Sequence, residues 1–180
     1  EEKFEALKKV ANDTLIYGRE AQRYMNYNTD NLATKGVDIN ENGTLTVPDE
    51  TFKKVQNINT EYKVTSVTLN VSNTIKVVYR IKLADEDGVS VKLTDSAGVL
   101  VKTTNAGEYL VYSSDIKATE FAKPFTLTLT KDSEVVSTVT YSVNDYIKYV
   151  AEKGESSSSY DITKAISYYS QSAVNYIKVA

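Results

Sequence analysis

The stretch that decides the fold is Ile75-Lys-Val-Val-Tyr-Arg-Ile-Lys-Leu83. Every second residue is apolar, in the order Ile75, Val77, Tyr79, Ile81, Leu83. Charged residues stand between them, namely Lys76, Arg80 and Lys82. Alternation with a period of two is typical of a β-strand that buries one face and exposes the other. The stretch therefore predicts a central strand of a sheet.

The same alternation continues on both sides of this strand. Apolar residues alternate with polar ones in residues 67–71, 89–93, 99–101, 109–112, 125–129 and 135–141. Turn-forming residues separate these runs at intervals of about eight to twelve residues, a spacing typical of an antiparallel sandwich. The fold class predicted is mostly β with flanking α: an immunoglobulin-like or fibronectin-like β-sandwich over residues 37–142. A β-barrel is the alternative.

Residues 1–36 are predicted to form a long helix and a connector. Apolar or small residues recur three or four positions apart, the spacing of a packed helix face: Phe4, Leu7, Ala11, Thr14, Gly18, Ala21 and Met25. A second stripe, Val10, Tyr17 and Tyr24, runs beside the first, so we expect two neighbours for this helix. Gly18 lowers helix propensity, and we interpret it as a point of close approach by another helix.

Residues 143–180 are predicted to form a helical hairpin that packs with the N-terminal helix. Ser142-Val-Asn-Asp145 resembles a capping box, and Gly154 is a natural helix stop. The closing stretch, residues 169–177, repeats the skeleton of residues 17–25, with Tyr169 in the place of Tyr17. The opening helix is expected either to complete a three-helix cluster or to be the tail of a preceding module.

Composition excludes several function classes. The 180 residues contain no Cys, His or Trp, which removes Cys nucleophiles, disulfides, Ser-His-Asp triads and imidazole zinc sites. A net charge of −3 argues against nucleic-acid binding. No apolar run reaches the roughly 18 residues that cross a bilayer, so we expect no membrane insertion.

One segment matches a cation-binding pattern. Oxygen-bearing side chains at Asp38, Asn40, Asn42, Thr44 and Asp49, with Gly43 in the sixth place, fit the twelve-residue calcium loop except for its final Glu. The alternative is a plain turn at Asn42-Gly43. A short helix is predicted to follow, over residues 48–55. Calcium is the only cofactor that the sequence suggests.

Tyrosine is unusually frequent, with fourteen Tyr against four Phe. A tyrosine ring packs while its hydroxyl stays hydrated, so Tyr-rich strands are suited to binding faces. The candidate ligand-binding residues are Tyr79, Tyr109, Tyr112 and Tyr141.

Four motifs of the sequence carry a family resemblance. The most specific are Tyr17-Gly-Arg-Glu-Ala-Gln-Arg-Tyr-Met-Asn-Tyr-Asn-Thr-Asp30 and Thr138-Val-Thr-Tyr-Ser-Val-Asn-Asp-Tyr146. Two weaker ones are Ser72-Asn-Thr-Ile-Lys-Val-Val-Tyr-Arg80 and Ile116-Lys-Ala-Thr-Glu-Phe121. Together they resemble repeat modules in large secreted or surface proteins of anaerobic gut Firmicutes. The resemblance implies a non-catalytic accessory module of an extracellular protein. The closing helix departs from the pattern, because Tyr169-Ser170 stands where Tyr-Gly is expected.

These observations lead to one expected function and two alternatives. We expect a non-catalytic structural or adhesive module, extracellular or on the cell surface. Its partners would be neighbouring modules or a host or bacterial surface protein. A carbohydrate-binding module that uses exposed tyrosines, with calcium as a stabiliser, is the alternative. A glycosidase would need two facing carboxylates, and the sequence selects no such pair. The chain begins at Glu1-Glu2 without a signal peptide, so we expect a fragment.

Overall fold

A computed structural model describes residues 1–36, 43–71, 74–94, 100–105, 108–113 and 116–180, with the backbone alone for residues 100–105 and 108–113. Within these ranges eight β-strands lie in two four-stranded antiparallel sheets. The first sheet has the order β1 (Lys54–Asn57), β8 (Glu134–Tyr141), β7 (Phe125–Lys131), β4 (Val89–Thr94). The second has the order β2 (Lys63–Asn70), β3 (Lys76–Lys82), β6 (Glu108–Ser113), β5 (Leu100–Asn105).

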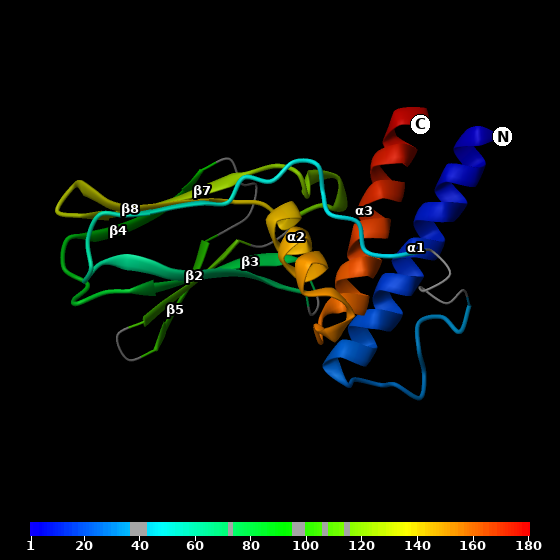
Figure 1. Ribbon diagram of the computed structural model, residues 1–180, viewed down its shortest axis with the longest axis horizontal. Helices are drawn as coiled ribbons and strands as arrows, with labels where there is room; N and C mark the ends of the chain where they lie inside the picture. Colours follow the sequence, from blue (N-terminus) through cyan, green and yellow to red (C-terminus); the bar gives the residue numbers. More distant parts are fainter. Residues whose placement is uncertain (37–42, 72–73, 95–99, 106–107, 114–115) are drawn as a thin grey trace.

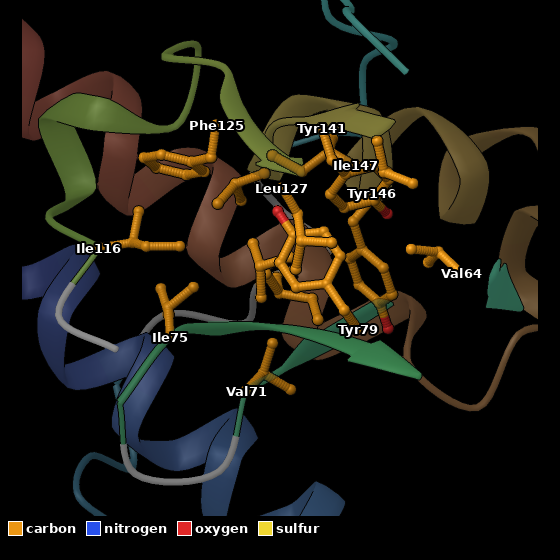
Figure 2. Packing of buried hydrophobic residues seen from close by; sticks show 14 of the residues in the cluster. Val64, Val71, Ile75, Tyr79, Ile116, Phe125, Leu127, Tyr141, Tyr146 and Ile147 are labelled. Atoms are coloured by element: carbon orange, nitrogen blue, oxygen red, sulfur yellow. The ribbon is translucent and has the colours of Figure 1, made fainter. Parts of the chain in front are cut away.

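The buried faces of both sheets belong to one hydrophobic core. Val77, Tyr79 and Ile81 of β3 are fully buried, as the alternation in residues 75–83 predicts. Leu127 of β7 and Val139 of β8 are fully buried in the same cluster. Figure 2 shows side chains of both sheets meeting there with Tyr146 and Ile147 of helix α2.

Helix α2 (Val143–Lys153) begins at the predicted capping box. The Asp145 amide donates to Ser142 Oγ, and Asp145 Oδ2 accepts from the Ser142 amide at 2.7 Å. These bonds satisfy backbone donors that the first turn of a helix leaves unpaired. Gly154, with φ of 68°, ends the helix as predicted. The Ser142–Asp145 interpretation is therefore confirmed.

Helices α1 (Glu2–Met25) and α3 (Tyr160–Val179) lie side by side and run antiparallel (Figure 1). At one end of the pair Lys3 Nζ donates to the carbonyl oxygen of Ala180 at 3.0 Å. Ile16 of α1 packs against Ala165 of α3, both buried. Helix α2 contacts α3 on the side of the sheets (Figure 1). The opening helix thus packs lengthwise on the closing helix of the same chain.

The predicted packing face of α1 is wrong at both ends of the helix, although Ala21 of the first stripe and Tyr17 of the second pack against the core. Phe4, Leu7 and Met25 are about half exposed or more, whereas the buried residues of the helix include Ala6 and Ile16. The buried face also holds charged side chains, Asp13, Arg19 and Glu20. Periodicity shows which residues share a face, but the partner decides which face is covered, and α3 covers the side of α1 that carries Ile16 and Tyr17. Gly18 does not meet a helix: a Cβ there would lie 3.2 Å from the Cβ of Ala33, in the connector that folds back along α1.

The fold is mixed α and β rather than mostly β. In the described part of the chain the three α-helices have 24, 11 and 20 residues, whereas each strand has eight or fewer. The N-terminal helix, the antiparallel sheets and the C-terminal helices are as predicted. The helix predicted over residues 48–55 is wrong, because residues 54–57 form edge strand β1 and residues 48–53 are not helical. Within the described residues no helix is both long enough and apolar enough to span a membrane.

Candidate functional site

The proposed calcium-loop residues fall into two groups. Asp38, Asn40 and Asn42 lie outside the described residues. Thr44 lines one cavity together with Tyr160 and Lys164, whereas Asp49 lines another, beside α3. Among the described residues no group of three or more acidic side chains could hold a metal ion. The calcium loop therefore stays a prediction.

Two of the four candidate ligand-binding tyrosines are buried. Tyr79 is fully buried and Tyr141 is 3% exposed, because both side chains belong to the core between the sheets. Neither can form an exposed platform, so that part of the prediction is wrong. The side chains of Tyr109 and Tyr112, in β6, lie outside the described part of the structure. Tyr141 nevertheless reaches the wall of a cavity.

This cavity, which we call the tyrosine cavity, has a volume of about 480 Å³. Its walls come from α2, from β2 and from residues 51–53, which precede β1. Three tyrosines line it, from the end of β8 and from α2: Tyr141, Tyr146 and Tyr149. The polar lining residues are Thr51, Lys53, Thr68, Asp145, Lys148 and Glu152.

Asp145 holds two walls of the tyrosine cavity together. Its Oδ1 accepts from the amides of Phe52 and Lys53, both at 2.8 Å, and its Oδ2 accepts from the amide and hydroxyl of Ser142. One carboxylate therefore caps α2 and fixes residues 51–53 beside it. Since Asp145 is only 6% exposed and already accepts these bonds, its role is to shape the cavity.

Tyr149 is the exposed aromatic side chain of the cavity. It is 50% exposed, and its ring centroid lies 6.4 Å from that of Tyr146, tilted by 40°. Lys153 Nζ lies 4.5 Å from the Tyr149 ring centroid, within the range of a cation–π contact. Tyr146 and Lys153, both residues of α2, thus contact the Tyr149 ring, while half of the Tyr149 side chain stays accessible to solvent.

The charged groups at the rim are accessible as well. Lys148 Nζ lies 3.9 Å from Glu152 Oε1, and the two side chains are 44% and 61% exposed. Exposed pairs at this distance are weak and readily exchange partners with water or a ligand. Burial, together with the Asp145 charge, raises the pKa of Tyr141, so its hydroxyl stays protonated at neutral pH. The cavity thus combines hydrogen-bond donors, acceptors and an aromatic surface.

A second cavity, of about 570 Å³, lies between α3, residues 46–50 and the 3₁₀ turn η2 (Ala118–Glu120). Asp49, Glu50, Gln171, Asn175 and Lys178 contribute polar groups to it. Its one aromatic lining residue, Phe121, is almost fully buried. This cavity has polar groups without an exposed ring, and the tyrosine cavity is therefore the better candidate.

Tyr146 and Tyr149 were missed as site residues in the sequence, although a signal for one of them exists. The apolar stripe of α2 contains Val143, Ile147 and Val150, and Tyr149 falls outside it, which predicts exposure. Comparisons with family models, with curated proteins and with solved structures gave no match to this chain.

Proposed function

We propose that the chain is a non-catalytic structural or adhesive module of a bacterial extracellular or cell-surface protein, which contacts other proteins. The motif resemblance of residues 17–30 and 138–146 supports the compartment. The sequence supports a non-catalytic role, because it lacks His, the most frequent general acid–base residue, and Cys, the most nucleophilic side chain at neutral pH.

The observation that carries this proposal is the arrangement of the helices and the sheets. The α1–α3 pair lies at one end of the molecule, and the two sheets extend away from that pair (Figure 1). The far ends of the sheets therefore stand clear of the two long helices. This geometry favours presentation of the sheets to a partner over spacing of modules in series.

We further propose that the two sheets form an immunoglobulin-type sandwich. In that fold strands A, B, E and D make one sheet and C, F and G the other. The order β2-β3-β6-β5 corresponds to A-B-E-D, and β4, β7 and β8 correspond to C-F-G, with β1 added beside β8. This strand order favours a sandwich over the barrel alternative. Such folds often present their turns to partners, by analogy alone.

The orientation of the module provides a test. The chain has no Cys, so one introduced cysteine gives a unique attachment point. One set of beads would carry the protein through a cysteine added after Ala180. A second set would carry it through Glu134→Cys, at the turn between β7 and β8. Adhesion of both sets to bacterial and host epithelial cells would be counted. We expect adhesion for the end-attached protein and its loss when the turn is blocked. Equal adhesion in both orientations, or none in either, contradicts the proposal.

Carbohydrate binding is the second candidate function, with calcium as a possible stabiliser. The observation that favours it is the half-exposed Tyr149 ring in a cavity with polar walls.

Calcium can be tested separately by thermal melting with calcium and with chelator, for the unchanged chain and for Asp38→Ala. A calcium-dependent rise in melting temperature that is lost in Asp38→Ala supports the loop, and no rise contradicts it.

A further inference from the structure

We propose that the tyrosine cavity binds a neutral sugar unit, which packs its C–H groups against Tyr149 and hydrogen-bonds the polar rim. This inference rests on the carbohydrate-binding function proposed above and specifies its site and ligand class.

The charges in the cavity argue for a neutral ligand. Two cationic residues, Lys53 and Lys148, line it together with two anionic ones, Asp145 and Glu152, so the formal charges of the lining residues cancel. The ammonium of Lys153, which is not a lining residue, lies against the Tyr149 ring. Buried or clustered charges of one sign would favour a counter-ion. With balanced charges, neither an anion nor a cation gains a net Coulomb attraction. A neutral polar ligand avoids the cost of removing a full charge from water.

The hydrogen-bonding groups match a ligand rich in hydroxyls. A sugar hydroxyl both donates and accepts. Lys53 and Lys148 supply donors, Glu152 supplies an acceptor, and the hydroxyls of Thr51 and Thr68 can do either. Hydroxyl groups can therefore find partners of both kinds around one cavity.

The aromatic ring provides the apolar contact. Tyr149 is half exposed, and its contacts with Tyr146 and Lys153 restrict its motion before any ligand binds. A side chain that is already ordered loses less conformational entropy on binding. The volume of about 480 Å³ also lies within the range of about 300–1,000 Å³ usual for small-molecule sites. The cavity thus has room for one or two sugar units.

The experiment begins with an array of neutral and acidic glycans, probed with the whole 180-residue chain. The best neutral ligand is then titrated calorimetrically into the unchanged chain and into Tyr149→Ala, Tyr149→Phe and Glu152→Ala. Tyr24→Ala serves as control, because Tyr24 is 44% exposed but lies on α1, away from the cavity. Thermal melting of each variant checks that it folds.

We expect Tyr149→Ala to weaken binding at least about tenfold, Glu152→Ala to weaken it less, and Tyr149→Phe and Tyr24→Ala to change it little. Affinity should change little between about 50 and 500 mM salt, because the ligand is uncharged. Binding that survives Tyr149→Ala overturns the site and leaves carbohydrate binding standing. Salt-sensitive binding of acidic glycans alone overturns the ligand class. No glycan bound at all overturns both the inference and the carbohydrate-binding function.

Discussion

Tyr17 of α1 and Tyr169 of α3 stack on each other, with ring centroids 6.1 Å apart and planes inclined by 10°. These two residues hold matching places in the two similar stretches near the ends of the sequence. Because α1 and α3 are antiparallel, the other matched residues, such as Tyr24 and Tyr176, lie towards opposite ends of the pair. Burial and the neighbouring Tyr169 raise the pKa of Tyr17. Among the matched tyrosines of the two stretches, Tyr17 and Tyr169 are thus the pair that comes together where the antiparallel helices pass each other.

Replacing both stacked rings should cost less than the two single replacements together. For stacked aromatic pairs the coupling is about 0.5–1.5 kcal/mol beyond area burial. Urea unfolding of Tyr17→Leu, Tyr169→Leu and the double variant measures this coupling. A parallel cycle with Tyr24→Leu and Tyr169→Leu is the control and should be additive. Additivity in both cycles would contradict a favourable stack.

Tyr79→Phe should leave stability unchanged or raise it by up to about 1 kcal/mol. The Tyr79 hydroxyl is buried in the core, and among the described residues it has no hydrogen-bond partner. A buried polar group without a partner costs free energy, which its removal recovers. Tyr79→Leu, which removes the ring as well, should instead cost about 3 kcal/mol by leaving a cavity. Unfolding free energies of the two variants check this, and a clear loss in Tyr79→Phe would show that the hydroxyl is paired.

The elements that could be predicted from sequence are those set by local chemistry. Residues 75–83 carry their own period of two, and Ser142 and Asp145 lie three positions apart, so strand β3 and the start of α2 follow from neighbouring residues alone. The face of α1 that packs could not be predicted in this way. Phe4 and Leu7 share a stripe, but the position of α3, far along the chain, leaves that stripe exposed.

The candidate site was harder to predict than the fold because it is built from distant segments. Lys53, Thr68 and Tyr149 meet only after β2, α2 and the segment before β1 have packed together. The sequence offers Tyr141 as a candidate ligand-binding residue, yet its side chain is buried and only reaches the cavity wall. Alternation shows which residues share a face of a strand. It does not show which of the two faces is buried, and tyrosine occurs on buried and on exposed faces alike.

Stability should fall more steeply at acidic pH for the unchanged chain than for Asp85→Asn. Asp85 accepts from the Tyr62 hydroxyl at 2.6 Å and from Lys131 Nζ at 2.9 Å. The bond from the Tyr62 hydroxyl lowers the pKa of the Asp85 carboxyl most, and the bond from Lys131 lowers it further. Because the folded state favours the charged form, this contribution is present above about pH 4 and is lost as the pH falls through the folded pKa.

Thermal melts between about pH 2 and pH 7 measure this difference. Asp85→Asn should be less stable at neutral pH and should converge with the unchanged chain in acid. Asp87→Asn is the control, since the Asp87 contact with Lys131 is made by its carbonyl oxygen. Parallel melting curves for the unchanged chain and Asp85→Asn would contradict the assigned role.

Asn57→Ala should destabilise the chain by about 1–3 kcal/mol, because the Asn57 side chain joins the two sheets. At the end of β1 it donates to the Val64 carbonyl oxygen at 3.1 Å and accepts from the Val64 amide at 3.2 Å, across to β2. Its Oδ1 also accepts from Ser137 Oγ of β8 at 2.5 Å. Removing it leaves the Ser137 hydroxyl, which is fully buried, without that partner.

Urea unfolding compares Asn57→Ala with Asn57→Asp and Gln56→Ala. Asn57→Asp keeps the acceptor oxygen but loses the donor to Val64 and brings a negative charge next to a carbonyl oxygen, so it should also destabilise. Gln56, the preceding residue of β1, is exposed like Asn57, but its side chain accepts only a long, exposed hydrogen bond, from Thr138 Oγ1 of the same sheet at 3.3 Å. Its replacement should therefore change stability by less than about 0.5 kcal/mol. If Asn57→Ala costs no more than Gln56→Ala, the side chain does not hold the sheets together, and the hydrophobic core alone sets their relative position.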